Sequence, residues 1–169
     1  HPAAFVDERA QLGVGVEVEP GAVIGPNVRI GDRCRIGSHA LVTGWTTLGA
    51  ECRLFHGAVV GTAPQDLKYA GERSQVEIGE RTTIREYATV HLAAEPGAVT
   101  RLGSDGLIMA YAHVAHDCQI GDHVIIANAT QLAGYVTVED WAIIGGLSAV
   151  HQFVRIGCHA IIGGASRIP

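Results

Sequence analysis

Residues 24–42 read Ile-Gly-Pro-Asn-Val-Arg-Ile-Gly-Asp-Arg-Cys-Arg-Ile-Gly-Ser-His-Ala-Leu-Val, with an aliphatic residue at every sixth position. The same period runs through the chain, because 25 of the 28 positions divisible by six hold Leu, Ile or Val. The three exceptions are Asp66, Glu72 and Pro96. A period of six matches neither the roughly 3.6 residues per turn of an α-helix nor the roughly 3.5 of a coiled coil. The pattern therefore predicts short strands that each end at a corner.

A second class of small or β-branched residues recurs four places after each aliphatic anchor. Its members are Ala22, Cys34, Ala40, Ala58, Thr82, Ala88, Ala112, Cys118, Ala142 and Ala160. We expect both the anchor and the small residue to face inward. One such unit cannot bury its own apolar face, so the units must wind and stack. Glycine directly follows the anchor in 12 of its 22 occurrences, and we expect it to serve the turn.

The succession of an aliphatic residue, a glycine and four further residues resembles the hexapeptide-repeat, left-handed parallel β-helix. This resemblance implies an all-β fold with three units in each coil of about 18 residues, and coils ~4.8 Å apart. We expect residues 1–169 to form one such domain. The broken anchors predict two loop excursions, at about residues 62–77 and 91–101. The first is polar and is the leading candidate for function, whereas the second has the composition of a plain flexible loop.

Charge and composition exclude several classes of protein. The chain has 12 Lys and Arg against 17 Asp and Glu, a net charge of −5, which gives no support for nucleic-acid binding. No apolar run approaches the ~20 residues that span a membrane, so we expect no membrane insertion. Four cysteines without close pairing make no disulfide framework, and Cys34 and Cys52 fall at inward positions, as expected of buried thiols. These features favour a cytoplasmic protein.

Nine histidines stand out in a chain that is poor in charge. In a coil of three units, residues 18 apart share one line along the prism, so His116, Gly134 and Gln152 align. The same edge also carries His113, Asp117 and His151. The alternative to a functional site is that such residues are solvated polar side chains at corners, as we expect for His39 and His56.

This cluster suits acyl transfer without a covalent enzyme intermediate. A histidine with a pKa near neutrality can act as general base toward a hydroxyl or an amine. Gly134 has no side chain to block a ligand, and its N–H would stabilise an oxyanion if it points outward. Gln152 would bind a polar substrate group further along the same groove.

A zinc site is the rival interpretation, because hexapeptide-repeat carbonic anhydrases bind zinc through three histidines. His123 and His159 lie two coils apart on one line, ~9.6 Å from each other. One zinc ion cannot reach both, since Zn–N bonds are ~2.0–2.1 Å long. Trp141, which lies between them, is no ligand. We therefore predict no metal site, and no cofactor is indicated.

Five motifs make a closer resemblance visible. They are Gln-Asp-Leu-Lys-Tyr-Ala-Gly (65–71), His-Val-Ala-His-Asp-Cys (113–118), Leu-Ala-Gly (132–134), Ile-Gly-Gly (144–146) and Ala-Val-His-Gln-Phe (149–153). Together they closely resemble the acyl-carrier-protein–UDP-N-acetylglucosamine O-acyltransferases of lipid A biosynthesis, over essentially the whole chain. The resemblance implies a cytoplasmic homotrimer with active sites in clefts between subunits. Its reaction would move an (R)-3-hydroxyacyl chain from acyl carrier protein to the 3-hydroxyl of UDP-GlcNAc.

The resemblance also implies a role for each matching residue. His116 corresponds to the general base, Asp117 stands beside it, and Gly134 corresponds to the glycine that serves the oxyanion. The substrate-binding positions match Asp66, Lys68, His113, His151 and Gln152. Gly164 matches the position whose bulk limits acyl-chain length, and glycine there implies room for a longer chain.

Three features depart from the family pattern. Tyr135 stands where the family usually has His, and Leu92 stands where a basic residue is common. The family continues into a C-terminal helical domain that contacts the nucleotide and the carrier protein, and nothing in residues 1–169 corresponds to it. Two alternatives stay open: a related acyltransferase acting on an amino-sugar nucleotide, and a catalytically idle β-helix that binds a sugar nucleotide or serves as a trimeric scaffold.

Overall fold

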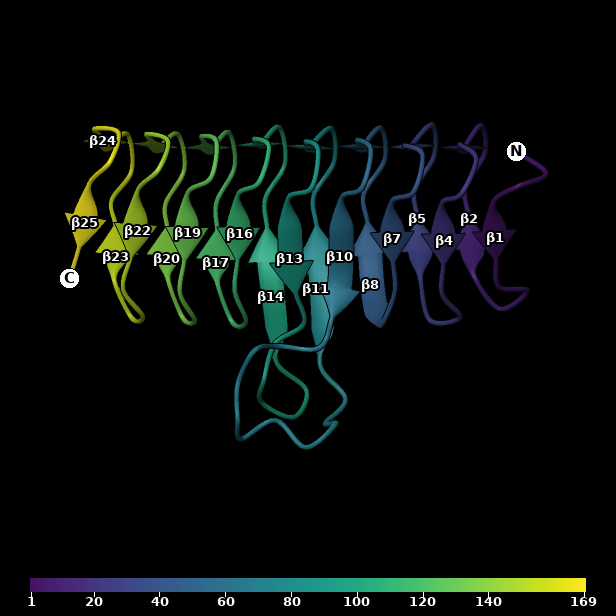
Figure 1. The fold of residues 1–169 in the computed structure, drawn as a ribbon, viewed down its shortest axis with the longest axis horizontal. Coiled ribbons are helices and arrows are strands. Elements are labelled where there is room, and N and C mark those ends of the chain that lie inside the picture. Colours follow the sequence, from purple (N-terminus) through teal and green to yellow (C-terminus); the bar gives the residue numbers. More distant parts are fainter.

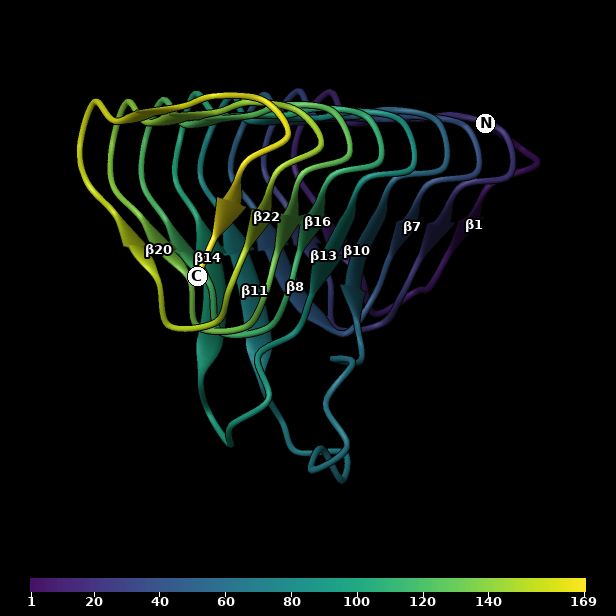
Figure 2. The ribbon, with the colours of Figure 1, turned by 60° about the vertical axis from the view of Figure 1, so that its left-hand side comes forward.

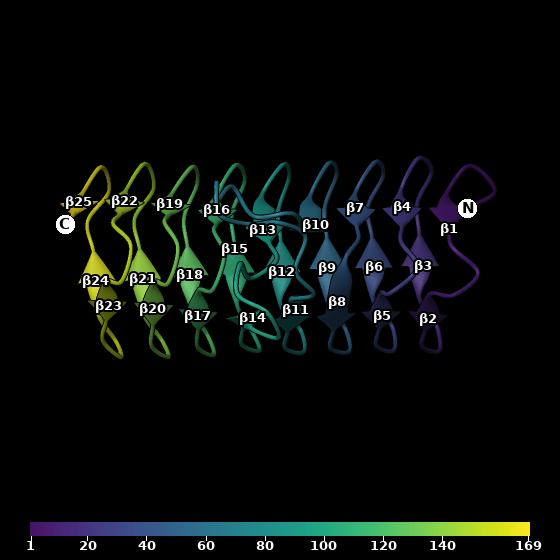
Figure 3. The ribbon, with the colours of Figure 1, turned by 90° about the horizontal axis from the view of Figure 1, so that it is seen from below.

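Short stacked strands make up the molecule. The computed structural model describes residues 1–169, which form strands β1 to β25 and no helix. The strands build three parallel sheets, the faces of a prism that the chain visits in turn (Figure 1 and Figure 3). The fold is a left-handed parallel β-helix, as predicted, the opposite hand from the usual crossover between parallel strands. No helix long and apolar enough to cross a membrane is present.

Each sheet takes every third strand of the chain. The first sheet contains β1 (Phe5–Val6), β4 (Val23–Ile24), β7 (Leu41–Val42), β10 (Val59–Thr62), β13 (Thr89–His91), β16 (His113–Val114), β19 (Gln131–Leu132), β22 (Ala149–Val150) and β25 (Arg167–Ile168). The second sheet contains β2 (Gln11–Leu12), β5 (Arg29–Ile30), β8 (Trp45–Leu48), β11 (Gln75–Ile78), β14 (Val99–Leu102), β17 (Gln119–Ile120), β20 (Thr137–Val138) and β23 (Arg155–Ile156). The third sheet contains β3 (Glu17–Val18), β6 (Arg35–Ile36), β9 (Arg53–Leu54), β12 (Thr83–Ile84), β15 (Leu107–Ile108), β18 (Ile125–Ile126), β21 (Ile143–Ile144) and β24 (Ile161–Ile162).

The turns between the sheets define three corners. The first corner joins the first sheet to the second, the second corner joins the second to the third, and the third corner returns to the first sheet. In the coil that begins with β16 they are residues 115–118, 121–124 and 127–130.

Two loops leave the first corner without disturbing the repeat. Neighbouring strands such as β5 and β8 pair residues that are 18 apart. Trp45 pairs instead with Gln75, 30 residues on, and Gln75 pairs with Val99, 24 residues on. Loop 1 (residues 63–74) therefore adds 12 residues and loop 2 (residues 92–98) adds six. Both additions are multiples of six, so the anchors stay in phase, and both loops hang from the same side of the prism (Figure 2).

The core is a column of aliphatic side chains along the prism axis. Its largest fully buried Ile and Leu side chains are all anchors: Ile24, Ile36, Leu48, Ile84, Leu102, Ile108, Ile126, Leu132 and Ile144. Most residues four places on are buried as well, and the hydroxyls of Thr82, Thr130 and Ser148 among them donate to backbone carbonyls. Thr82 Oγ1 donates to the Gly103 carbonyl at 2.7 Å, for example. Both predicted inward positions are confirmed.

Apart from Gly61, whose φ angle is 84°, the glycines that follow the anchors do not adopt the left-handed backbone of the turn, contrary to our expectation. A Cβ on Gly31 would lie 2.7 Å from the backbone nitrogen of Ala50 in the next coil. Glycine is needed there because neighbouring coils approach too closely for a side chain. The left-handed backbone lies two residues further on, where Arg33 and His39 have φ angles of 54° and 57°. Most corners therefore turn on an ordinary residue, whereas Gly15, Gly21 and Gly57 take the same position in three others.

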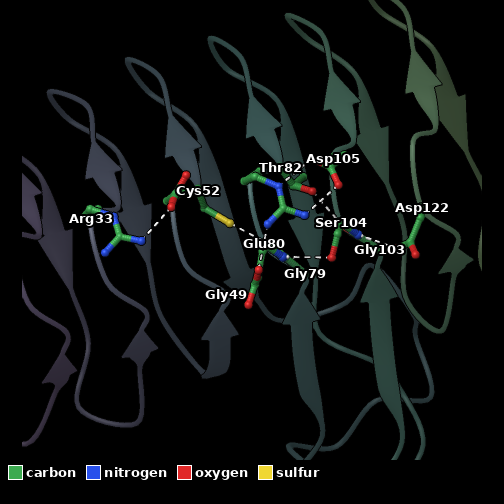
Figure 4. A network of polar contacts seen from close by, with 12 residues as sticks. Arg33, Gly49, Cys52, Gly79, Glu80, Thr82, Gly103, Ser104, Asp105 and Asp122 are labelled. Atoms are coloured by element: carbon green, nitrogen blue, oxygen red, sulfur yellow. Dashed lines mark hydrogen bonds and ion pairs between the residues drawn. The ribbon is translucent and has the colours of Figure 1, made fainter.

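Three of the four cysteines are inward-facing small residues, as predicted. Cys34, Cys52 and Cys118 are buried free thiols, and Cys158 is exposed. Cys52 Sγ donates to the Gly79 carbonyl at 2.9 Å (Figure 4). The thiols thus fill space in the core and bond to the next coil.

Candidate active site

The first corner carries a histidine and a carboxylate in direct contact. His116 Nδ1 lies 2.9 Å from Asp117 Oδ2, and only 13% and 8% of the two side chains are exposed. Because an ionised carboxylate only accepts, Nδ1 carries the proton in this contact and Nε2 keeps a lone pair. His116 can therefore take a proton at Nε2, and Asp117 would stabilise the imidazolium that forms.

Loop 2 and the neighbouring strand β14 hold Asp117 in place. Asp117 Oδ2 accepts the Ala94 N–H at 2.9 Å, and the Asp117 N–H donates to Thr100 Oγ1 at 2.8 Å. The φ angle of Asp117 is 59°, in the left-handed region that Asp tolerates better than most residues. Loop 2 is therefore more than the flexible loop that its composition indicates. Neither Ala94 nor Thr100 gives a signal in the sequence for this role.

Gly134 lies under the imidazole ring of His116, on the next coil. A Cβ at this position would be 2.4 Å from His116 Cε1, so only glycine leaves room for the ring. The Gly134 N–H has no hydrogen-bond acceptor in the structure. At the equivalent positions of the second corner, Ser104 Oγ accepts the Glu80 N–H and Asp122 Oδ1 accepts the Ser104 N–H (Figure 4). The free N–H beside His116 is thus available to a ligand oxygen.

Two clefts meet at His116. The first, of about 630 Å³, follows the first sheet, and its lining includes His113, His116, Gly134, His151 and Gln152. The second, of about 980 Å³, lies between the two loops and the first corner, and its lining includes Asp66, Lys68, His116 and Gln152. Gln65, to which the sequence assigned no role, lines both. The structure therefore brings all the predicted site residues except Asp117 and Gly164 onto two adjoining clefts, with Asp117 bonded to His116 behind them.

His113 packs against a buried histidine that the sequence did not single out. The rings of His113 and His91 meet edge to face with 4.7 Å between centroids, and His113 Nδ1 lies 2.6 Å from Thr89 Oγ1. Burial, and then the nearby His91 and His116, lower the pKa of His113 from 6.5 to about 4. Burial and His116 also lower the pKa of His91, whose Nδ1 is buried without a partner. Both rings are therefore neutral at neutral pH.

Tyr135 closes the second cleft on the side of loop 2. Its ring stands edge-on to His116 at 5.3 Å and stacks on Phe153 at 4.9 Å. Its hydroxyl donates to Glu95 Oε1 at 3.2 Å. Burial, followed by the charges of Asp117 and Glu95, raises the pKa of Tyr135, so the hydroxyl stays protonated. The residue that replaces the expected histidine thus bonds to loop 2.

Two groups considered from the sequence lie on other corners. Gly164 follows β24 on the third corner and lines neither cleft. On the second corner, Trp141 stacks between His123 and His159, with centroid distances of 3.8 Å and 6.1 Å. The indole therefore separates the two histidines that a zinc ion would have to share.

Comparisons with known proteins agree with one another. The family described as bacterial transferase hexapeptide (six repeats) matches residues 9–44 and 100–134. An acyl-(acyl-carrier-protein)–UDP-N-acetylglucosamine O-acyltransferase of Herminiimonas arsenicoxydans is 53% identical over 142 residues, 83% of this chain and 54% of the relative. The protein of the same name from Thermodesulfovibrio yellowstonii is 47% identical over 143 residues, 84% of this chain and 55% of the relative. This chain therefore spans about half the length of the curated relatives that it matches.

Solved structures extend the match to the whole of this chain. LpxA from Acinetobacter baumannii superimposes with a TM-score of 0.98 at 42% identity, covering 100% of this chain and 66% of that one. LpxA of Bacteroides fragilis, a UDP-N-acetylglucosamine acyltransferase, gives a TM-score of 0.97 at 38% identity with the same coverage. Over the matched length, the prism and its loops follow the same path in these proteins.

Proposed function

This chain is a homologue of the UDP-N-acetylglucosamine O-acyltransferases, and we propose that it moves an (R)-3-hydroxyacyl chain from acyl carrier protein to the 3-hydroxyl of UDP-GlcNAc. This would be the first step of lipid A biosynthesis. The observation that carries the proposal is the His116–Asp117 pair lying over Gly134 at the junction of two clefts. The names of the relatives supply both substrates, and the site supplies a base and a free N–H for them.

In the proposed reaction, His116 acts as general base and Gly134 stabilises the oxyanion. Nε2 of His116 takes the proton of the sugar 3-hydroxyl as this oxygen attacks the thioester carbonyl. A C–O bond forms, the carbonyl oxygen becomes an oxyanion, and the Gly134 N–H donates to it. The C–S bond then breaks, and the imidazolium returns its proton to the leaving thiolate. Asp117 stabilises the imidazolium between the two steps.

The residues that line the clefts would bind the two substrates. Lys68 is the only lysine of the chain and lines the second cleft, where it suits an anionic group of the nucleotide. His113 is neutral and can exchange a hydrogen bond with a hydroxyl in the first cleft. Asp66, His151 and Gln152 add polar contacts from loop 1 and the first corner.

We propose that the working unit is a homotrimer in which the third sheet forms the subunit contact. Its outer face carries an aliphatic stripe, Leu107, Ile125, Ile143 and Ile161, and Ile143 and Ile161 are 36% and 75% exposed. Monomeric proteins seldom leave such a stripe uncovered. Gly164 follows the stripe, so it would border the cleft of a neighbouring subunit. Buried free thiols and the absence of a disulfide support a cytoplasmic location.

The proposal is tested by acyl transfer from acyl carrier protein to UDP-GlcNAc, with the purified chain and its His116→Ala variant. Loss of turnover in this variant, with an unchanged circular dichroism spectrum, is the expected result. His123→Ala, on the second corner, is the matched control and should retain activity. Turnover of His116→Ala near the parent level would contradict the mechanism. No turnover by the parent chain would favour the catalytically idle, sugar-nucleotide-binding alternative.

One observation favours a second acceptor. The second cleft collects Asp66, Glu72 and Glu95 against the single cation of Lys68. This excess of carboxylates would attract an amino group, as in an amino-sugar nucleotide. UDP-GlcNAc and its 3-amino analogue should therefore be assayed side by side. A higher kcat/KM for the amine would change the proposed reaction from O-acylation to N-acylation.

A further inference from the structure

A third cavity lies on the outer face of the second sheet, away from both clefts. It has a volume of about 280 Å³ and lies over β2, β5, β8 and β11, which are neighbours in the sheet (Figure 1). It shares no lining residue with the two clefts at His116. We call it the arginine groove, after Arg9, Arg29 and Arg73 in its lining.

The charge of the arginine groove is unusual for this chain. The protein carries a net charge of −5, yet no carboxylate lines the groove. Arg29 and Arg73 form no ion pair, whereas most other arginines of the chain do. Glu77 lies on the same line across the sheet as Thr47 and Arg29. Its carboxylate accepts a hydrogen bond from Arg101 and forms no ion pair with Arg29. Two guanidinium groups therefore face one cavity without a counter-ion.

Arg73 is fixed in position before any ligand arrives. Its guanidinium lies over the indole ring of Trp45, 3.6 Å from the ring centroid, which is a cation–π contact. The Arg73 carbonyl accepts the Gly97 N–H at 2.8 Å, and the Ser74 hydroxyl donates to the Ala93 carbonyl. Both loops thus hold the backbone that carries this side chain. A guanidinium stacked on a ring keeps the N–H donors at its edge free for an anion.

The geometry points to a site for a small molecule that bears a phosphate or diphosphate group. The planar fork of arginine matches phosphate oxygens in pairs, and such charge-assisted bonds are stronger than neutral ones. Thr47 and Gln75 offer neutral donors to the same cavity. A concave cavity of this size suits one phosphorylated group, whereas a protein partner needs a broad, flat surface. The proposal does not depend on the acyltransferase activity, because the groove lies outside the clefts that serve it.

Trp45 is the natural reporter for this site. The chain has two tryptophans, so Trp141→Phe leaves Trp45 as the only indole. Titration of this variant with inorganic pyrophosphate at low ionic strength should give a saturable change in fluorescence. Sodium chloride at matched ionic strength should not reproduce it. A merely linear, non-saturating response would overturn the proposal.

Two substitutions in the Trp141→Phe background decide whether binding is specific. Arg29→Gln should raise the Kd for pyrophosphate by about tenfold or more, the loss expected for one charge-assisted hydrogen bond. Arg53→Gln is the matched control, because Arg53 also lacks an ion pair but lies on β9 of the third sheet, outside the groove. Melting curves verify that both variants fold. Equal loss of affinity in both variants would show non-specific charge attraction and overturn the proposed site.

Discussion

Gly134→Ala isolates the contact on which the proposed chemistry depends. The φ angle of Gly134 is outside the left-handed region, so alanine fits the backbone. Its Cβ would lie 2.4 Å from His116 Cε1 and 2.6 Å from Nε2. Non-bonded carbon atoms prefer roughly 3.5–4.0 Å, so the ring must move away by about 1 Å. A misplacement of about 1 Å at the reacting centre costs about 10²-fold in rate. We therefore expect kcat/KM to fall by about two orders of magnitude while the fold is kept.

The assay is acyl transfer at several UDP-GlcNAc concentrations, together with thermal melting. Gly106→Ala is the control, because its Cβ would meet Thr82 at 3.5 Å, an ordinary contact. Nitrogen-15 NMR of the His116 ring supplies a second readout, since displacement of the ring alters the Nδ1–Asp117 hydrogen bond. Full kcat/KM in Gly134→Ala, with His116→Ala inactive, would refute the inferred position of the ring.

Three further predictions follow from the same geometry. Asp117→Asn should lower kcat by on the order of 10²–10⁴-fold, because it removes the charge that stabilises the imidazolium. Asp122→Asn on the second corner is the control and should leave kcat unchanged. Equal losses of kcat in the two variants would contradict the role of Asp117. The lowered pKa of His113, about 4 against 6.5, means that the unfolded chain binds more protons between these values, so stability should fall as pH drops from 6.5 to 4. The melting temperature of His113→Gln should fall less over that window, and identical pH slopes would count against this cause. Ile143→Glu on β21 should turn a trimer into monomers, as measured by the molar mass from light scattering. Thr137→Glu on the second sheet should leave the mass unchanged. A trimeric Ile143→Glu variant would exclude the third sheet as the subunit contact.

The repeat alone predicts most of the fold, and with it half of the site. A period of six fixes which residues face inward, and the buried anchors agree with it. Placing His116, Gly134 and Gln152 on one line required only the length of a coil. No loop interrupts the coils after residue 98, so that spacing stays at 18.

The contacts that involve loop 2 could not be predicted from the 18-residue spacing of the coils. Thr89, which pairs with His113, precedes it by 24 residues because loop 2 intervenes, so the line back to His91 is shifted. The bond from the Ala94 N–H to Asp117 depends on the path of loop 2 in space. A backbone N–H has no residue-type signature, and a lone alanine in a sequence gives no indication of it. The prediction that the glycines after the anchors serve the turn was wrong for a related reason. These glycines are needed because neighbouring coils approach closely, and the sequence of one repeat does not show that distance.

Loop 1 and loop 2 each add a whole number of repeats to one coil. Each loop is an insertion at the first corner of the prism that leaves the stacking of the neighbouring coils unchanged. A different segment exchanged at that corner would meet new substrates while every anchor kept its neighbour. The part of the second cleft that the loops supply can thus vary without changing the packed core, whereas the part that His116 and Gln152 supply belongs to the coils themselves.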